Sequence, residues 1–509
     1  MLRLIDDFLN KITMYRLVLY GLIFILAGAF LISFLGMIPY SPIALLFSTV
    51  FILILCWISN KIFSYAFNAP ANKESFYITA LILILLIAPP RDTNYTSFLT
   101  FATWASVLAI ASKFIITIGK KHIFNPVAFA VVVTAFTINR YADWWIGTLA
   151  MLPFVLVAGL LIVRKVQRFD LVLSFLITAL IIISVFSLQN GLNPLISIQK
   201  SLINSPILFF SFIMLTEPAT TPPGRKKRII YGTLTGLLFA PQVHLFGIYS
   251  TPELALVISN IYSYLISPKQ KLVLTLISKN TITKGMYNFV FSQDKKMDFK
   301  PGQYLEWTLA HKKPDSRGNR RYFTIASSPT ERDLIIGIKF YEKPSSFKST
   351  LLSLEQGDKI IASQLSGDFV LPKDKQKKLA FIAGGIGVTP FRSMIKYLID
   401  KNEKRSVVML YSNKTKEEIA YKDIFDQAQD KLSLKIVYTL TDMSNIPGGW
   451  QGETGPINKE IIQREIPDYK ERIFYISGPR SMVIFFEDTL KKMGVPKSCI
   501  NVDFFPGFT

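Results

Sequence analysis

The segment "LAFIAGGIGVTPFRSMIKYL", residues 379–398, decides the fold of the C-terminal half of this 509-residue chain. An apolar run of strand length leads into a Gly-Gly-Ile-Gly turn, and a helical pattern follows the turn. This order lets backbone amides approach a pyrophosphate closely. We therefore expect a nucleotide-binding α/β domain around this segment.

A second stretch, "NRRYFTIASSP" at residues 319–329, lies upstream of that domain. Arg321 can bind a diphosphate through two hydrogen bonds, Phe323 can lie against a flat ring, and Thr324 can offer its hydroxyl to the ring edge. Together these side chains suit a flavin nucleotide. The alternative is an ordinary strand with an exposed arginine and a core phenylalanine.

Between these two stretches lies "KPSSFKSTLLSLEQGDKI", residues 343–360. Ser346, Lys348 and Ser349 stand at the expected start of a helix, where amides and hydroxyls favour anions. We expect a second phosphate-binding point here.

In this order the three motifs resemble the ferredoxin-NADP reductase-like family, whose flavin motif is Arg, any residue, Tyr or Phe, then Ser or Thr. Arg321-Tyr322-Phe323-Thr324 matches that motif. The resemblance implies an NAD(P)H-dependent flavin oxidoreductase that binds FAD and either NADH or NADPH. It also implies a six-stranded antiparallel FAD-binding β-barrel over 267–374 and an NAD(P)-binding α/β domain over 375–509. The glycine turn matches the family's nicotinamide-nucleotide segment at Gly384, Gly385, Gly387, Thr389 and Pro390.

The last two matching segments depart from the family pattern. "IFYISGPRSM" (473–482) keeps Gly478 and Pro479 but has Ser477 where the family has cysteine, so we expect a working site with an altered hydride-transfer rate. The end "DFFPGFT" resembles the aromatic terminus that covers the flavin, with Phe508 as candidate; the alternative is a core aromatic. The resemblance places Thr324, Ser477 and Phe508 at the reacting rings. Ser412 and Lys414 are candidates for contact with a 2′-phosphate.

Up to residue 266 the chain is a series of apolar runs, which predicts an α-helical membrane bundle. Several runs are shorter than the roughly 20 residues of a full crossing, so we expect half-helices that meet inside the bundle. With both termini cytoplasmic, the inner segments hold 17 Lys and Arg and the outer ones 3, which predicts a multi-pass protein of the inner or plasma membrane without a cleavable signal. The ten predicted spans are 15–36, 41–59, 75–89, 97–118, 126–138, 144–163, 169–188, 205–215, 229–241 and 252–266.

Charge and composition exclude several classes of protein. The net charge of +22 follows from membrane topology and from lysines mixed with acids, so we do not expect nucleic-acid binding. Two cysteines, Cys56 and Cys499, cannot hold an iron–sulfur cluster, and three histidines cannot supply two bis-histidine haem sites. We expect no metal site, and any electron transfer must use flavins or diffusible carriers.

Two short segments of the apolar half, "KHIFNPVAFA" (121–130) and "FIMLTEPATTPPGRKKR" (212–228), resemble the NqrB/RnfD family of membrane proteins. The resemblance implies ten spans and flavin within or beside the bundle. The family's threonine segment for covalent flavin has no match in "QNGLNPLISIQKSLINSP" (189–206). We therefore expect a noncovalent flavin, FMN or riboflavin.

The breaker loops of the bundle occur in pairs five predicted spans apart and on opposite faces, as in an inverted repeat. The alternative is that their polar residues are ordinary loop and helix-cap residues. Glu217 carries the most weight because an acid at a helix break near a bilayer costs energy unless it is paired or functional. The inner flavin site is predicted from His122, Asn125, Thr216, Glu217, Thr220 and Thr221, and an outer site from Arg91, Asp92, Thr93 and His244.

Three functions remain open from the sequence. The first is a transmembrane conduit that takes electrons from cytosolic NAD(P)H through FAD and membrane flavin to an extracytosolic acceptor. The second is a membrane-bound quinone or flavin reductase without transmembrane transfer. The third is a transporter whose reductase domain regulates it. Crossing a hydrocarbon core of roughly 30 Å demands more than one membrane cofactor in the first case.

Overall fold

The structure is a computed structural model that divides the chain into two compact units, Met1–Gln270 and Lys271–Thr509. We call them the first and the second unit and describe each by itself. The residues described are 5, 8–9, 12–67, 73–91, 95–118, 121–240, 242–245, 247–267, 272–293, 296–311, 315 and 318–503.

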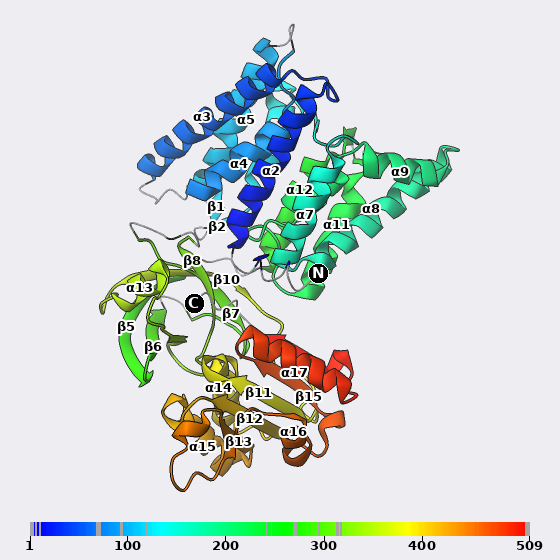
Figure 1. The fold of residues 1–509 in the computed structure, drawn as a ribbon. Helices are drawn as coiled ribbons and strands as arrows, with labels where there is room; N and C mark the ends of the chain where they lie inside the picture. The colour runs from blue at the N-terminus through cyan, green and yellow to red at the C-terminus, as the bar shows by residue number, and fades with distance from the viewer. Residues whose placement is uncertain are drawn as a thin grey trace. The chain divides into compact units, whose positions relative to one another are not determined.

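The first unit is helical, with two short hairpins (Figure 1). Several of its helices begin at proline, which is tolerated there because the first turn has no use for the missing N–H. Its elements are α2 (Met14–Phe34), α3 (Pro42–Ala66), α4 (Lys73–Leu86), α5 (Tyr95–Ile115), β1 (Thr117–Ile118), β2 (Lys121–His122), α6 (Pro126–Ile138), α7 (Leu152–Val166), α8 (Phe169–Gln189), α9 (Pro194–Ile203), α10 (Ile207–Phe209), a π-helical segment (Phe210–Met214), α11 (Arg225–Phe239), β3 (His244–Leu245), β4 (Ile248–Tyr249) and α12 (Pro252–Ile266).

The predicted count of ten spans is not supported. Within the described ranges four helices are long and apolar enough to cross a membrane: α2, α3, α5 and α8. A fifth results if α9 and the segment Ile207–Met214, bent by 66°, count as one span. The reason lies in the helix breakers, because α6 and α12 begin at Pro126 and Pro252 and run for only 13 and 15 residues. At 1.5 Å per residue such helices reach about 20 Å.

One order of elements occurs twice in the first unit. A long helix, a two-stranded hairpin and a short apolar helix that begins at proline follow one another as α5, β1–β2 and α6, and again as α11, β3–β4 and α12. The two short helices α6 and α12 pack against each other, and α2 packs against α7. A repeat requires this duplicated order. Its inverted orientation in a membrane stays a prediction.

The second unit begins with an antiparallel sheet in the order β8-β7-β10-β5-β6-β9, which is the predicted six-stranded barrel domain. Its core holds Phe289, Phe291, Trp307 and Phe347, all fully buried. The elements are β5 (Leu272–Thr283), β6 (Met286–Gln293), β7 (Tyr304–Thr308), β8 (Arg320–Thr324), β9 (Leu334–Lys339), α13 (Ser346–Leu352) and β10 (Lys359–Ser366).

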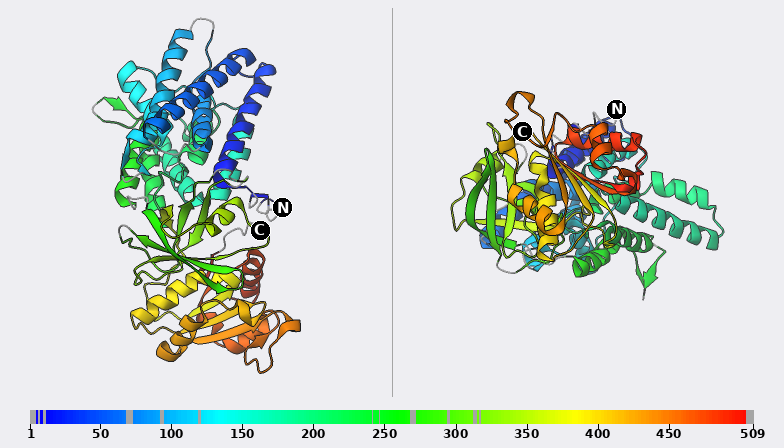
Figure 2. Two further views of the ribbon diagram at one scale, coloured as in Figure 1. Left: turned by 90° about the vertical axis from the view of Figure 1, so that its left-hand side faces the viewer. Right: turned by 90° about the horizontal axis from the view of Figure 1, so that it is seen from below.

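A parallel sheet in the order β14-β13-β12-β11-β15-β16 follows, which confirms the predicted α/β class. All six residues of β11 are buried, because helices cover both faces of the sheet: α14 and α15 one face, α16 and α17 the other (Figures 1 and 2). The elements are β11 (Leu379–Gly384), α14 (Thr389–Asp400), β12 (Val407–Asn413), α15 (Lys422–Leu432), β13 (Lys435–Leu440), β14 (Glu453–Thr454), α16 (Lys459–Glu465), β15 (Ile473–Ser477), α17 (Arg480–Lys492) and β16 (Ile500–Asp503).

A buried ion pair joins the two sheets of the second unit. Arg392 on α14 pairs with Glu331 and also donates to the carbonyl of Ala326, 3.0 Å away. Tyr421 adds a hydrogen bond of 2.7 Å from its hydroxyl to Asn288 on β6. These contacts fix how the flavin and nucleotide segments face each other.

Candidate functional site

The predicted flavin segments come together at the start of α13. The Arg321 guanidinium lies 5.2 Å from the ring centre of Phe347, and the rings of Phe323 and Phe347 are 5.9 Å apart. Lys348 donates to the carbonyl of Lys339, 2.9 Å away. Ser346, Lys348 and Ser349 therefore share one short helix beside Arg321.

An aspartate that the sequence motifs do not include occupies this anion position. Asp315 accepts the backbone N–H of Ser346 at 3.0 Å, and its other oxygen lies 3.5 Å from Arg321 Nη2. The Ser346 hydroxyl accepts the Asp315 N–H at 2.8 Å. An arginine and a backbone amide thus converge on a carboxylate, which is the donor set that a phosphate group needs. No sequence signal marked Asp315, because it stands in a loop outside every motif.

Two other residues of the flavin motif have structural partners. The Tyr322 hydroxyl donates to Glu306 at 2.8 Å, and Thr324 at the end of β8 is buried beside Tyr304 of β7. Both contacts hold β8 against β7, so the motif is placed by the sheet itself.

Close backbone packing joins the two nicotinamide segments. A Cβ on Gly387 would lie 2.5 Å from the Cα of Gly478, and one on Gly384 would lie 2.4 Å from Met482 Sδ. Gly385 has φ +51°, which favours glycine. Thr389 and Pro390 begin α14, and both are buried next to this turn. The structure therefore brings the glycine turn and the Ser477-Gly478-Pro479 segment together at the carboxyl ends of β11 and β15.

Three further residues lie at the same edge of the parallel sheet. Ser412 ends β12 beside Thr439 of β13, and Lys414 is exposed just beyond. The side chains of Asn413 and Thr439 are buried, and their polar atoms have no hydrogen-bond partner within the described ranges. A bound nucleotide or water can supply those partners. Phe508 lies outside the described residues.

Asp503 predicts a pH dependence of stability. It pairs in register with Ser477, and burial raises the pKa of its carboxyl to about 7. Between the unfolded pKa of about 4 and pH 7 the folded state binds more protons, so the free energy of unfolding falls as the pH rises through this range. We expect Asp503→Asn to flatten this slope. Thermal midpoints of both proteins at pH 5 and pH 8 test it, and parallel slopes would refute it.

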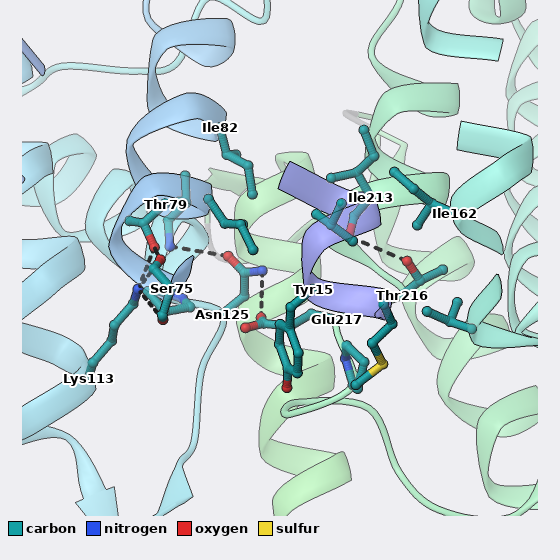
Figure 3. A pocket seen from close by; sticks show the side chains of 17 residues that line it. Tyr15, Ser75, Thr79, Ile82, Lys113, Asn125, Ile162, Ile213, Thr216 and Glu217 are labelled. Atoms are coloured by element: carbon teal, nitrogen blue, oxygen red, sulfur yellow. Dashed lines mark hydrogen bonds between the residues drawn. The ribbon is translucent and has the colours of Figure 1, made fainter. Parts of the chain in front are cut away.

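In the first unit, a cavity of about 80 Å³ contains part of the predicted inner site (Figure 3). Asn125 Nδ2 donates to Glu217 Oε2 at 2.8 Å, and Thr220 donates to the same oxygen at 3.3 Å. His122 Nε2 lies 3.7 Å from Glu217 Oε1, within ion-pair range but beyond hydrogen-bond distance. Thr216 lines the cavity and donates to the carbonyl of Phe212. Five of the six predicted residues thus share one contact network or cavity wall.

Thr221, the sixth predicted residue, is buried, and its hydroxyl has no partner in the part that the structure describes. Asn125 also accepts the first amides of α6, so its role as a helix cap, the alternative interpretation, holds as well. Its own N–H donates to Asn260 of α12 at 2.7 Å, and Asn260 donates to the Tyr231 hydroxyl at 2.7 Å. The network therefore reaches α11 and α12. The lysine of the cavity, Lys113, is absent from the sequence prediction.

The predicted outer set is not brought together as proposed. Arg91 lies 4.9 Å from the ring centre of Tyr40, whereas His244 packs on Tyr249 in the β3–β4 hairpin, which projects from the helices (Figure 2). Asp92 and Thr93 fall outside the described residues. At the end of α4 the structure instead shows polar residues that the prediction missed: Asp143 accepts the N–H of Ala88, and Trp144 donates to the buried Glu253 at 2.6 Å.

Comparison with known proteins assigns both units. Residues 136–270 match the model of the NQR2, RnfD, RnfE family, and residues 381–488 match the oxidoreductase NAD-binding domain. The chain joins an NQR2/RnfD/RnfE segment to an oxidoreductase NAD-binding domain. Both predicted resemblances are thereby confirmed, and the apolar helices together with the family match indicate a membrane protein.

Individual relatives match the second unit. Flavohemoprotein A of Dictyostelium discoideum is 25% identical over 222 residues, 41% of this chain and 53% of that protein. One component of the Na(+)-translocating NADH-quinone reductase of Yersinia pestis is 28% identical over 201 residues, 37% of this chain and 49% of that protein. The chain thus spans about half the length of these curated relatives. The FAD/NAD-binding domain of nitric oxide dioxygenase from Vibrio cholerae is 18% identical, with a TM-score of 0.41 over 46% of this chain and 98% of that one.

Proposed function

We propose that this chain is a membrane NAD(P)H–flavin oxidoreductase that passes electrons to flavin in the first unit and on to an extracytosolic acceptor. The observation that carries this proposal is the joining, in one chain, of an NAD-binding oxidoreductase domain to a family segment whose unit holds a polar cavity. The proposed location is the cell membrane, with both termini cytoplasmic.

FAD in the second unit would accept a hydride from NAD(P)H and release its electrons one at a time. The residues present fit this group, because Arg321 and the Ser346 amide already hold a carboxylate where phosphate is expected. Phe323 and Thr324 would position the ring. Lys348 and Ser349 would add contacts to the phosphates.

The nucleotide would bind along the carboxyl edge of the parallel sheet. The contact of Gly387 with Gly478 leaves no room for side chains between the two segments, which keeps their backbones close to the substrate. Thr389, Pro390 and Pro479 would shape the nicotinamide pocket, and Ser477 would face the ring. We propose that Phe508 covers the flavin until the nicotinamide displaces it.

The cavity of the first unit would hold the noncovalent flavin. Glu217 and Asn125 offer an acceptor and a donor at its wall, as the edge of a flavin ring requires. His122, Thr216, Thr220 and Thr221 complete the proposed inner site. Arg91, Asp92, Thr93 and His244 stay the proposed outer set.

Replacing Arg321 with alanine tests the cytosolic flavin. Loss of a charged hydrogen bond costs about 1.5–3 kcal/mol, so FAD affinity should fall about 10- to 150-fold. FAD per chain is measured after purification and after titration with added FAD. Arg332→Ala, an exposed arginine of the same unit, is the matched control. Equal FAD affinity in both variants would contradict the assignment.

A further inference from the structure

A lysine side chain lies in the wall of the cavity in the first unit. Lys113 stands near the end of α5, and its ammonium group reaches α4, where it donates to the Ser75 carbonyl at 2.9 Å, the Ser75 hydroxyl at 3.0 Å and the Thr79 hydroxyl (Figure 3). These three acceptors use all three N–H groups. They also fix the ammonium at a definite place on the cavity wall.

All three acceptors are uncharged, so the charge of Lys113 is not compensated locally. Among the described residues no carboxylate lies within ion-pair distance of its Nζ. Glu217 also lines the cavity, but its oxygens are engaged with Asn125, Thr220 and His122. An ammonium group in apolar surroundings costs several kcal/mol unless negative charge approaches it. The cavity is therefore arranged to receive negative charge on the side of Lys113.

The rest of the cavity suits a flat ring. Apolar side chains from four helices, Val18, Ile82, Ile162 and Ile213 among them, line it between the polar groups. An apolar pocket with few convergent polar groups is the usual site for a small ring ligand. Electron-carrying rings, both flavins and quinones, present carbonyl oxygens that gain negative charge when the ring is reduced.

We propose that Lys113 recognises a ring carbonyl of the electron carrier in this cavity and stabilises the charge that reduction places on it. This inference rests on the proposed function and deepens it by naming the residue that favours the reduced carrier. The electron comes from NAD(P)H by way of the second unit and adds one negative charge to the ring. Lys113 keeps its proton and donates a hydrogen bond to the charged oxygen.

Two substitutions separate this role from a structural one. Lys113→Met keeps the length of the side chain and removes its charge, whereas Lys113→Arg keeps the charge. In full-length protein, Lys113→Met should bind the oxidised carrier within about threefold of the parent. It should bind the reduced carrier at least about tenfold more weakly, as a charged hydrogen bond implies. Lys113→Arg should restore most of this difference.

Spectroelectrochemical titration of purified protein measures the ratio of the two affinities as a shift in midpoint potential, which should be negative for Lys113→Met. Lys61→Met is the control, since Lys61 lies over the Trp57 ring, away from the cavity. If Lys113→Met does not fold, Thr79→Val removes one acceptor of the ammonium and should shift the potential in the same direction.

Extraction of the wild-type protein identifies the carrier. A second flavin per chain assigns the cavity to flavin, and an extracted quinone without a second flavin assigns it to quinone; both support the proposal if the shift occurs. A bound carrier with an unchanged potential in Lys113→Met overturns the role of Lys113 and leaves the proposed function standing. A wild-type protein without any second carrier overturns the proposed function itself.

Discussion

Gly387→Ala should slow flavin reduction by NAD(P)H about 100-fold while FAD stays bound. The added Cβ would lie 2.5 Å from the Cα and 2.6 Å from the N of Gly478, and 2.7 Å from the carbonyl oxygen of Ser477. All three are backbone atoms, so one of the two segments must move. A displacement of about 1 Å at a reacting centre can cost about 100-fold in rate.

Stopped-flow mixing with NADH and with NADPH measures this rate at 450 nm, roughly where oxidised flavin absorbs. Gly448→Ala is the matched control, because a Cβ there meets no atom within 4 Å and its φ is not in the left-handed region. Its reduction rate should equal that of the parent. If both variants reduce flavin normally, the glycine turn does not form the nicotinamide site. If Gly387→Ala loses FAD itself, the turn has a structural role.

Glu217→Gln should lower electron transfer to the far side of the membrane at least about tenfold and leave dye reduction by the second unit unchanged. The carboxylate accepts hydrogen bonds from Asn125 and Thr220 and lies within ion-pair range of His122. Removal of its charge weakens these contacts by about 1.5–3 kcal/mol. The hydride step belongs to a different unit, so dye reduction should not change.

Asp170→Asn controls for loss of an ion pair elsewhere in the first unit. Asp170 on α8 pairs with Arg228 at 2.7 Å, and neither residue lines the cavity. Its variant should keep transmembrane transfer. Equal transfer in Glu217→Gln and wild type would remove Glu217 from the electron path, whereas equal loss in both variants would indicate general destabilisation.

The second unit was predictable because its motifs are local. The glycine turn, Arg321 and the Ser346 helix each follow from a few adjacent residues, and the order of the motifs predicted the two sheets that the structure shows. The ion pair of Arg392 with Glu331 was not predictable, since its partners stand 61 positions apart and match no motif. Asp315 was missed for the same reason.

The first unit was harder to predict from its sequence. An apolar run shows that a segment is buried or in lipid, but its length does not show where the helix ends. The run 144–163 predicted a full span, yet the chain is irregular until α7 begins at Leu152. Lys113 was counted as a topology signal, because a sequence does not show that a lysine near a helix end turns into a cavity. Glu217 was found because a helix break marked it.

The central claim is that electrons cross the membrane through the first unit. It is tested most directly in sealed vesicles that carry the full-length protein with its second unit outside and an impermeant acceptor trapped in the lumen. NAD(P)H added outside should reduce the trapped acceptor at a rate that depends on Glu217. Normal dye reduction outside, without any reduction of the lumenal acceptor in intact vesicles, would contradict the account and favour a quinone or flavin reductase confined to one side.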